Sequence, residues 1–102
     1  MVRFRLHPDA DAEAIEAAAR IKADDPAQGE MFVRAVEDAL LWVQKEPLLF
    51  HCFDGEFRKV RLGKFRYSLV FRIRDNEVQL LAIMHTSRRP GYWKKRSKNW
   101  PK

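Results

Sequence analysis

The first residues of the chain alternate between apolar and polar side chains. In residues 2–7, the apolar positions are Val2, Phe4 and Leu6, and the polar positions are Arg3, Arg5 and His7. Because successive side chains of a strand point to opposite faces, this period of two predicts a strand with one buried face. Pro8 interrupts the alternation and ends the predicted strand.

The pattern then changes, twice in succession, to the period of an amphipathic helix. A first helix is predicted from Asp9 to about Lys22, and a second from Pro26 until Pro47, with Asp25 as its N-cap. The apolar positions assigned to the inner faces are Ile15, Ala18 and Ile21 or Lys22 in the first helix, and Phe32, Val36, Ala39, Leu40 and Val43 in the second. We expect the two helices to form an antiparallel hairpin, with the acidic residues of the first on a solvent face.

The second half of the chain returns to strand-like patterns. Residues 48–56 are predicted to be a loop, followed by strands at about 57–62, 65–74 and 77–86. Two-residue turns are expected at Gly63-Lys64 and Asp75-Asn76. The predicted fold class is therefore α+β in a single domain of residues 1–102: an N-terminal strand, the helix hairpin, then a mostly antiparallel sheet of three further strands with the helices on one face.

Tight turns would fix which residues of the sheet share a face. Arg61 would lie opposite Arg66, and Arg66 opposite His85. The face away from the helices would then carry Lys59, Arg61, Arg66, Arg72, Arg74 and His85, with Leu81 and Ile83 between them. The other face would be an apolar layer covered by the helices. A solvated strand face remains the simpler reading of any single basic residue.

Charge is distributed unevenly along the chain. Residues 1–52 carry six Lys/Arg against ten Asp/Glu, whereas residues 53–102 carry fourteen against four. A basic half of this kind attracts nucleic-acid phosphates or an acidic protein partner. The single cysteine, Cys52, excludes an internal disulfide, and no Cys/His spacing suggests a metal site, so neither a metal nor a cofactor is expected. Without a long apolar stretch, we expect a cytoplasmic protein with no membrane partner.

Candidate chemistry lies at the end of the last predicted strand. A neutral His85 could act as a general base beside Arg66, or could simply be a hydrogen-bonding residue. Tyr92 and Trp93 could fold back over the sheet, either to stack on a nucleobase or to cap the core, and capping is favoured for Trp93. The basic residues of the following tail are Arg88, Arg89, Lys94, Lys95, Arg96 and Lys98, which fit either a solvated surface or a nonspecific nucleic-acid patch.

This order of elements, ending in the motif His85-x-x-Arg88-x-Pro90-x-Tyr92-Trp93, resembles the RelE/ParE superfamily of bacterial toxins. The resemblance covers nearly the whole chain, and its most specific parts are residues 66–71 and 81–90. It implies the toxin of a type II toxin-antitoxin module. Such a toxin inhibits growth and is neutralised by a cognate acidic antitoxin whose extended segment wraps around it.

The resemblance leaves two mechanisms open. A RelE-like toxin is an endoribonuclease that cleaves ribosome-bound mRNA. Its roles would fall on Lys59 and Arg61 as paired phosphate-holding cations, Arg66 as transition-state stabiliser, His85 as general base and Tyr92 as the stacking residue. A ParE-like toxin is not an enzyme but inhibits DNA gyrase, and its basic face would serve antitoxin binding only. Further nucleic-acid or antitoxin contacts are expected from Arg72, Arg74, Arg88, Arg89 and Arg96. The alternative is a non-toxic basic nucleic-acid-binding module.

Overall fold

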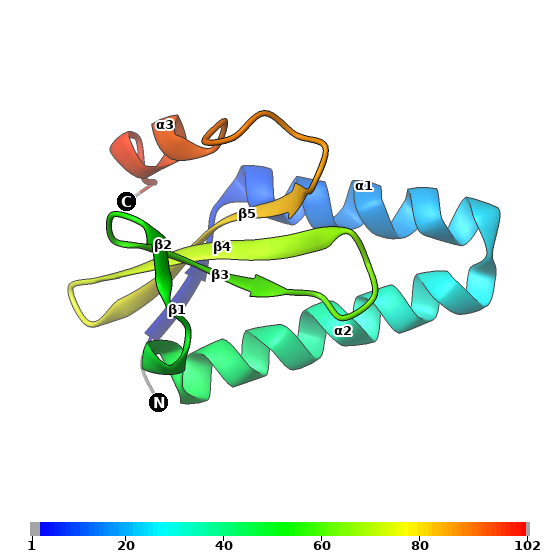
Figure 1. The fold of residues 1–102 in the computed structure, drawn as a ribbon, viewed down its shortest axis with the longest axis horizontal. Coiled ribbons are helices and arrows are strands. Elements are labelled where there is room, and N and C mark those ends of the chain that lie inside the picture. The colour runs from blue at the N-terminus through cyan, green and yellow to red at the C-terminus, as the bar shows by residue number, and fades with distance from the viewer. Residues whose placement is uncertain (1–2, 102) are drawn as a thin grey trace.

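The computed structural model describes residues 3–101 and contains one sheet, a helix hairpin and a short C-terminal helix (Figure 1). The elements are β1 (Arg3–Leu6), α1 (Pro8–Asp24), α2 (Pro26–Lys45), a 3-10 turn (Pro47–Leu49), β2 (Cys52–Asp54), β3 (Phe57–Arg61), β4 (Tyr67–Arg74), β5 (Glu77–His85) and α3 (Lys94–Lys98). The predicted α+β class is confirmed. Val2, expected in the first strand, lies outside the described residues.

The sheet has five strands in the order β1-β5-β4-β3-β2. β1 runs parallel to β5, and the other neighbours are antiparallel. The additional strand, β2, occupies part of the segment that was expected to be a loop. α1 and α2 cover one face of the sheet, and the C-terminal segment with α3 lies across the other side (Figure 1).

α2 begins directly after its predicted N-cap, Asp25, whereas α1 begins at Pro8, one residue earlier than predicted, and His7 is its N-cap. The Nδ1 atom of His7 accepts a hydrogen bond from the Asp9 N–H at 3.0 Å, and a carboxylate oxygen of Asp25 accepts one from the Ala27 N–H at 3.0 Å. Each satisfies a donor that the first turn of a helix leaves free. The assignment of Ile15 to the inner face is wrong, since its side chain is 64% exposed and Ala10 and Ala17 are buried instead.

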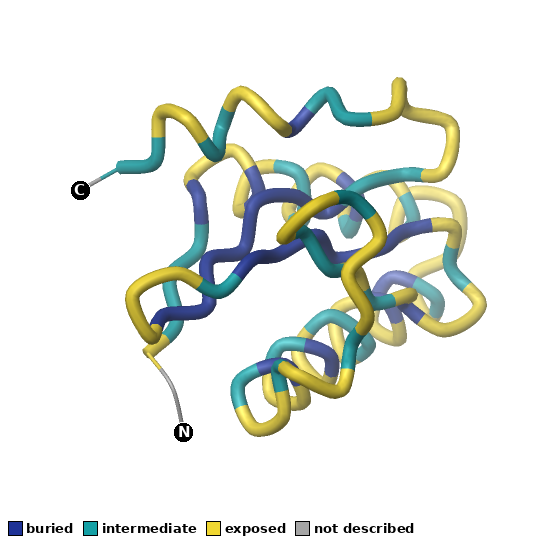
Figure 2. The backbone as a smooth tube through the Cα atoms, turned by 60° about the vertical axis from the view of Figure 1, so that its left-hand side comes forward, coloured by how far each residue is buried: buried dark blue, intermediate teal, exposed yellow. Residues whose placement is uncertain are grey.

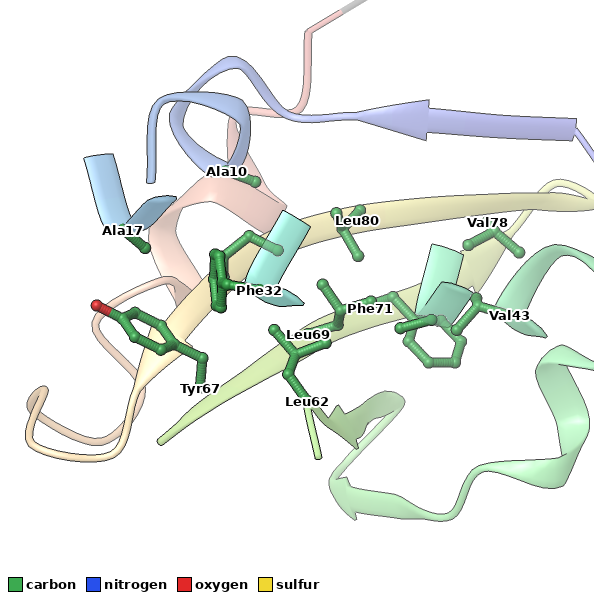
Figure 3. Close-up of a cluster of buried hydrophobic side chains, with 12 residues drawn as sticks. Ala10, Ala17, Phe32, Val43, Leu62, Tyr67, Leu69, Phe71, Val78 and Leu80 are labelled. Atoms are coloured by element: carbon green, nitrogen blue, oxygen red, sulfur yellow. The ribbon is translucent and has the colours of Figure 1, made fainter. Parts of the chain in front are cut away.

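The main core lies between the helix hairpin and the sheet (Figure 3). Phe32 of α2 is fully buried and packs edge-on against Tyr67 of β4 and against Phe65, with ring centroids 5.2 Å apart in both pairs. The burial is concentrated on β4 and β5, whereas the outward turns of both helices are exposed (Figure 2). Central strands covered on both faces explain this distribution.

The two predicted turns have different outcomes. Asp75 and Asn76 both have positive φ, as a type I′ turn requires, and Arg74 pairs with Glu77 as expected. The turn at Gly63-Lys64 is longer than predicted, because the Leu62 N–H donates to the Tyr67 carbonyl and Arg61 pairs with Ser68. The expected pairing of Arg61 with Arg66 is therefore wrong, although a shift of two residues leaves the faces of β3 unchanged.

A β-bulge in β5 changes the face of every residue that follows it. Val70 pairs with Ala82 while Phe71 pairs with Leu80, so Leu81 is the additional residue. Leu81 faces away from the helices as predicted, but Ile83 belongs to the core beneath them. His85 moves to the helix side with Ile83.

The face opposite the helices is covered by the C-terminal segment. Trp93 is 1% exposed and forms a second small core with Val70, Leu81 and Ala82. Its ring packs edge-on against Phe57 at 4.7 Å. The capping role predicted for Trp93 is confirmed. The expectation that this face is open is therefore wrong over its central part.

Candidate functional site

Three exposed cations remain together at one end of the covered face. Lys59 and Arg61 alternate along β3 on that face, and the alternation of β4, extended back from Ser68, places Arg66 beside them. We call these three residues the basic platform. Within residues 3–101 none of them forms an ion pair, and the Lys59 ammonium lies 4.9 Å from the ring centroid of Phe53. The platform can therefore attract an anionic partner without first breaking an internal ion pair.

His85 does not join the basic platform. It pairs with Tyr67 rather than Arg66, because the bulge at Leu81 shifts the register by one residue. Its imidazole packs edge-on against the Tyr67 ring at 4.9 Å, and its Nδ1 atom accepts a hydrogen bond from the Ser87 N–H at 3.0 Å. The prediction that the His85 and Arg66 side chains lie side by side on one face is therefore wrong.

Tyr92 is half-buried, and its side chain is held against α1. Its hydroxyl donates a hydrogen bond of 2.6 Å to Glu13 of α1, and the Arg88 guanidinium lies 3.9 Å from the centroid of its ring. Burial raises the pKa of Tyr92, and the hydrogen bond to the Glu13 carboxylate raises it further. The hydroxyl is therefore neutral at physiological pH, and Arg88 covers the ring on which a nucleobase was expected to stack.

Glu13 has a structural role at the edge of β5 that the sequence did not indicate. Beyond Leu6, β1 no longer covers the edge of β5, and two side chains take its place: Glu13 accepts the Ile83 N–H at 3.1 Å, and Arg96 donates to the Leu81 carbonyl at 2.9 Å. The same two side chains pair with each other at 2.8 Å. In the sequence, Glu13 is simply an acidic residue in an alanine-rich helix, a pattern equally typical of a side chain exposed to solvent.

Most of the arginines assigned to partner binding are engaged internally. Arg72 is 3% exposed and donates to the Gln79 side chain at 2.7 Å and to the Ser97 carbonyl at 3.0 Å. Arg74 forms two hydrogen bonds with Glu56, at 2.9 and 2.7 Å, which lower the pKa of that carboxyl. Arg88 and Arg96 both contact Glu13. Of the five predicted binding arginines, Arg89 is the one that is exposed without an ion pair in the described part of the chain.

Neither metal ligands nor a membrane span stand out in the structure. Among residues 3–101, no group of three His, Cys, Asp or Glu side chains is arranged so that it could hold a metal ion. Over the same residues, the helices are too short or too polar to cross a bilayer.

The structure is a small α+β domain whose sheet is covered on one face by a helix hairpin and on the other by a C-terminal segment, with exposed cations at one end. The family model of the ParE toxin of the type II toxin-antitoxin system parDE matches residues 4–90. The chain therefore belongs to the ParE toxin family, within the RelE/ParE superfamily that the sequence resembles. A search among curated proteins gives no match. Membership of this family implies a cognate antitoxin as partner.

Proposed function

We propose that this toxin inhibits growth by acting on DNA gyrase rather than by cleaving mRNA, and that a cognate acidic antitoxin neutralises it. The observation that carries the proposal is the separation of the residues that cleavage would need. His85 lies on the helix side of the sheet, and the Tyr92 hydroxyl is bound to Glu13. Within the described residues, neither side chain contacts Lys59 or Arg61, the cations that would hold a phosphate in the nuclease mechanism. The match to the ParE toxin family supports the same conclusion.

General acid-base catalysis requires the catalytic group within about 2.6–3.2 Å of the proton it moves, directly or through one water. A 2′-hydroxyl positioned by the basic platform would have the sheet between itself and His85. The remaining candidate, Tyr92, has a raised pKa and so is poorly suited to accept a proton. The platform alone can bind phosphate but offers no general base.

The basic platform suits the antitoxin instead. Lys59, Arg61 and Arg66 are all exposed, and an acidic segment would relieve the electrostatic repulsion between them. Such contacts would accelerate association more than they would tighten the complex. The platform is then needed for rapid neutralisation and dispensable for toxicity.

Replacing all three platform residues with glutamine tests the division of roles. We expect the triple variant to fold and to arrest bacterial growth as the wild type does, while the antitoxin neutralises it more slowly. A matched control replaces Lys22, Arg34 and Lys45, three exposed cations of α1 and α2, with glutamine. Loss of toxicity in the platform variant alone would favour the nuclease mechanism.

Cell-free bacterial translation with added protein tests the cleavage mechanism directly. Mapping of mRNA 5′ ends should show intact message if the proposal is correct. Cuts that appear only on translated message would overturn it. Strongly salt-dependent binding to bare RNA or DNA, without any growth arrest, would instead indicate the non-toxic binding module.

A further inference from the structure

A small polar cavity lies between α1 and the end of β5, on the helix side of the sheet. It has a volume of about 160 Å³. Its polar lining includes Glu16, Arg20, Tyr67, His85, Ser87 and Arg88. None of these residues belongs to the basic platform. The cavity lies next to the part of the β5 edge that β1 does not cover, where Glu13 and Arg96 bond to the backbone of β5.

Tyr67 and His85 each bring a hydrogen-bond donor to the lining of the cavity. Tyr67 is 8% exposed, and across residues 3–101 its hydroxyl forms no hydrogen bond with a protein atom. Figure 3 shows that this hydroxyl projects from the core toward Ala17, another residue of the cavity wall. In His85, Nδ1 already accepts the Ser87 N–H, so the proton of the neutral ring is on Nε2. The Tyr67 hydroxyl is accessible from the cavity, so it is free to donate a hydrogen bond to a ligand there.

The charges around the cavity also favour an anion. Arg20 supplies a guanidinium group that has no ion pair in the described part of the chain. Arg88 supplies a second guanidinium group, which already lies 3.9 Å from a Glu13 oxygen. The Glu13 carboxylate is matched by Arg96 at 2.8 Å, so its charge is largely neutralised. Glu16 is the one carboxylate that opposes an incoming anion. The balance remains cationic.

We propose that this cavity binds the carboxylate of an acidic side chain from a partner peptide. A cavity of roughly 150 Å³ accommodates a group the size of benzene, so a glutamate side chain fits but a nucleotide does not. The carboxylate would accept hydrogen bonds from the Tyr67 hydroxyl and the Arg20 guanidinium, the planar donor that matches carboxylate geometry. The inference rests on the proposed function only for the source of this side chain, the acidic antitoxin.

Titration with two capped peptides tests the cavity by itself. ¹⁵N-labelled protein is titrated with acetyl-Ala-Glu-Ala-amide and, separately, with the isosteric glutamine peptide, while amide and side-chain NMR signals are followed. We expect saturable shifts of Ile83, His85 and Ser87 with the glutamate peptide alone. Inorganic phosphate forms a third titration. Shifts with phosphate and none with the glutamate peptide would overturn the proposal.

Substitutions in the lining give opposite expected effects. Arg20→Gln and Tyr67→Phe should each weaken binding of the glutamate peptide by roughly threefold or more, whereas Glu16→Gln should strengthen it by roughly threefold, as charge contacts of this exposure allow. Arg34→Gln removes an exposed cation outside the cavity and should change nothing. Circular dichroism verifies that each variant is folded.

Equal shifts with both peptides, or weaker binding in Glu16→Gln, would contradict a carboxylate ligand. Neither result would affect the proposed function, because growth arrest and gyrase inhibition are measured without the peptide. Conversely, a protein that binds the glutamate peptide but does not arrest growth would retain the cavity and refute the toxin mechanism.

Discussion

Replacement of Glu13 by alanine should destabilise the protein more than replacement of any other acidic residue of α1. The Glu13 and Arg96 side chains are only 13% and 11% exposed, and the carboxylate also accepts the Tyr92 hydroxyl and the Ile83 N–H. Removing one partner of a buried ion pair costs about 3–5 kcal/mol, because the other charge is left unpaired. We expect about 3 kcal/mol, the lower end of that range, since Arg96 keeps a contact of 3.7 Å with Asp9.

Urea unfolding followed by circular dichroism measures this loss. With an unfolding entropy of about 2.1 cal/mol/K per residue, a loss of about 3 kcal/mol lowers the midpoint of thermal unfolding by about 14 °C. Glu16→Ala, an exposed change one turn along the same helix, should stay within about 0.5 kcal/mol of wild type. Adding Arg96→Met to Glu13→Ala should recover part of the stability, because it removes the unpaired charge. A Glu13→Ala loss below about 1 kcal/mol would refute the assignment of Glu13 as the residue that closes the edge of β5.

Three further predictions follow from individual contacts. The pKa of Tyr92 is raised in the folded state, so stability should fall as pH rises above about 10, the pKa of tyrosine in the unfolded chain. Tyr92→Phe should remove this loss of stability at high pH. Absorbance at 295 nm would show one of the two tyrosines titrating late. Burial lowers the pKa of His7, so stability should fall as pH decreases below about 6.5. His7→Asn keeps an acceptor for the Asp9 N–H, and in this variant the midpoint of urea unfolding should depend less on pH across that range. Gly29→Ala should destabilise by about 1–3 kcal/mol despite the better helix propensity of alanine, because its Cβ would lie 2.9 Å from the Lys22 Cα; unchanged or increased stability in urea unfolding would show that the helices can separate.

The regular elements could be predicted because each depends on local signals. Asp25 and Pro26 mark the start of α2 by capping chemistry that needs no tertiary contact. The Asp75-Asn76 turn likewise has residues suited to positive φ. The bulge at Leu81 has no such signal, since Leu81 and Ala82 are equally compatible with either face of a strand covered on both sides.

The bulge at Leu81 places His85 on the opposite face of the sheet from Lys59 and Arg61, so the residues of the predicted site do not come together. Before the bulge, Arg72 lies opposite Gln79 as expected; after it, His85 lies opposite Tyr67 and faces α1. The burial of Arg72 beneath the C-terminal segment could not be foreseen either, because it depends on how Trp93 folds back onto the sheet. A strand period gives relative faces correctly only while the register is unbroken.

Supercoiling of plasmid DNA by purified bacterial gyrase, with this protein added, tests the account most directly. Reactions are stopped with detergent and protease, so that DNA held in a cleaved gyrase complex is released as linear plasmid, and a reaction without gyrase is the control. If the protein traps gyrase on cleaved DNA, supercoiling is lost and linear plasmid accumulates as the protein concentration rises. Full supercoiling at a large molar excess of folded protein that arrests growth in cells would contradict it.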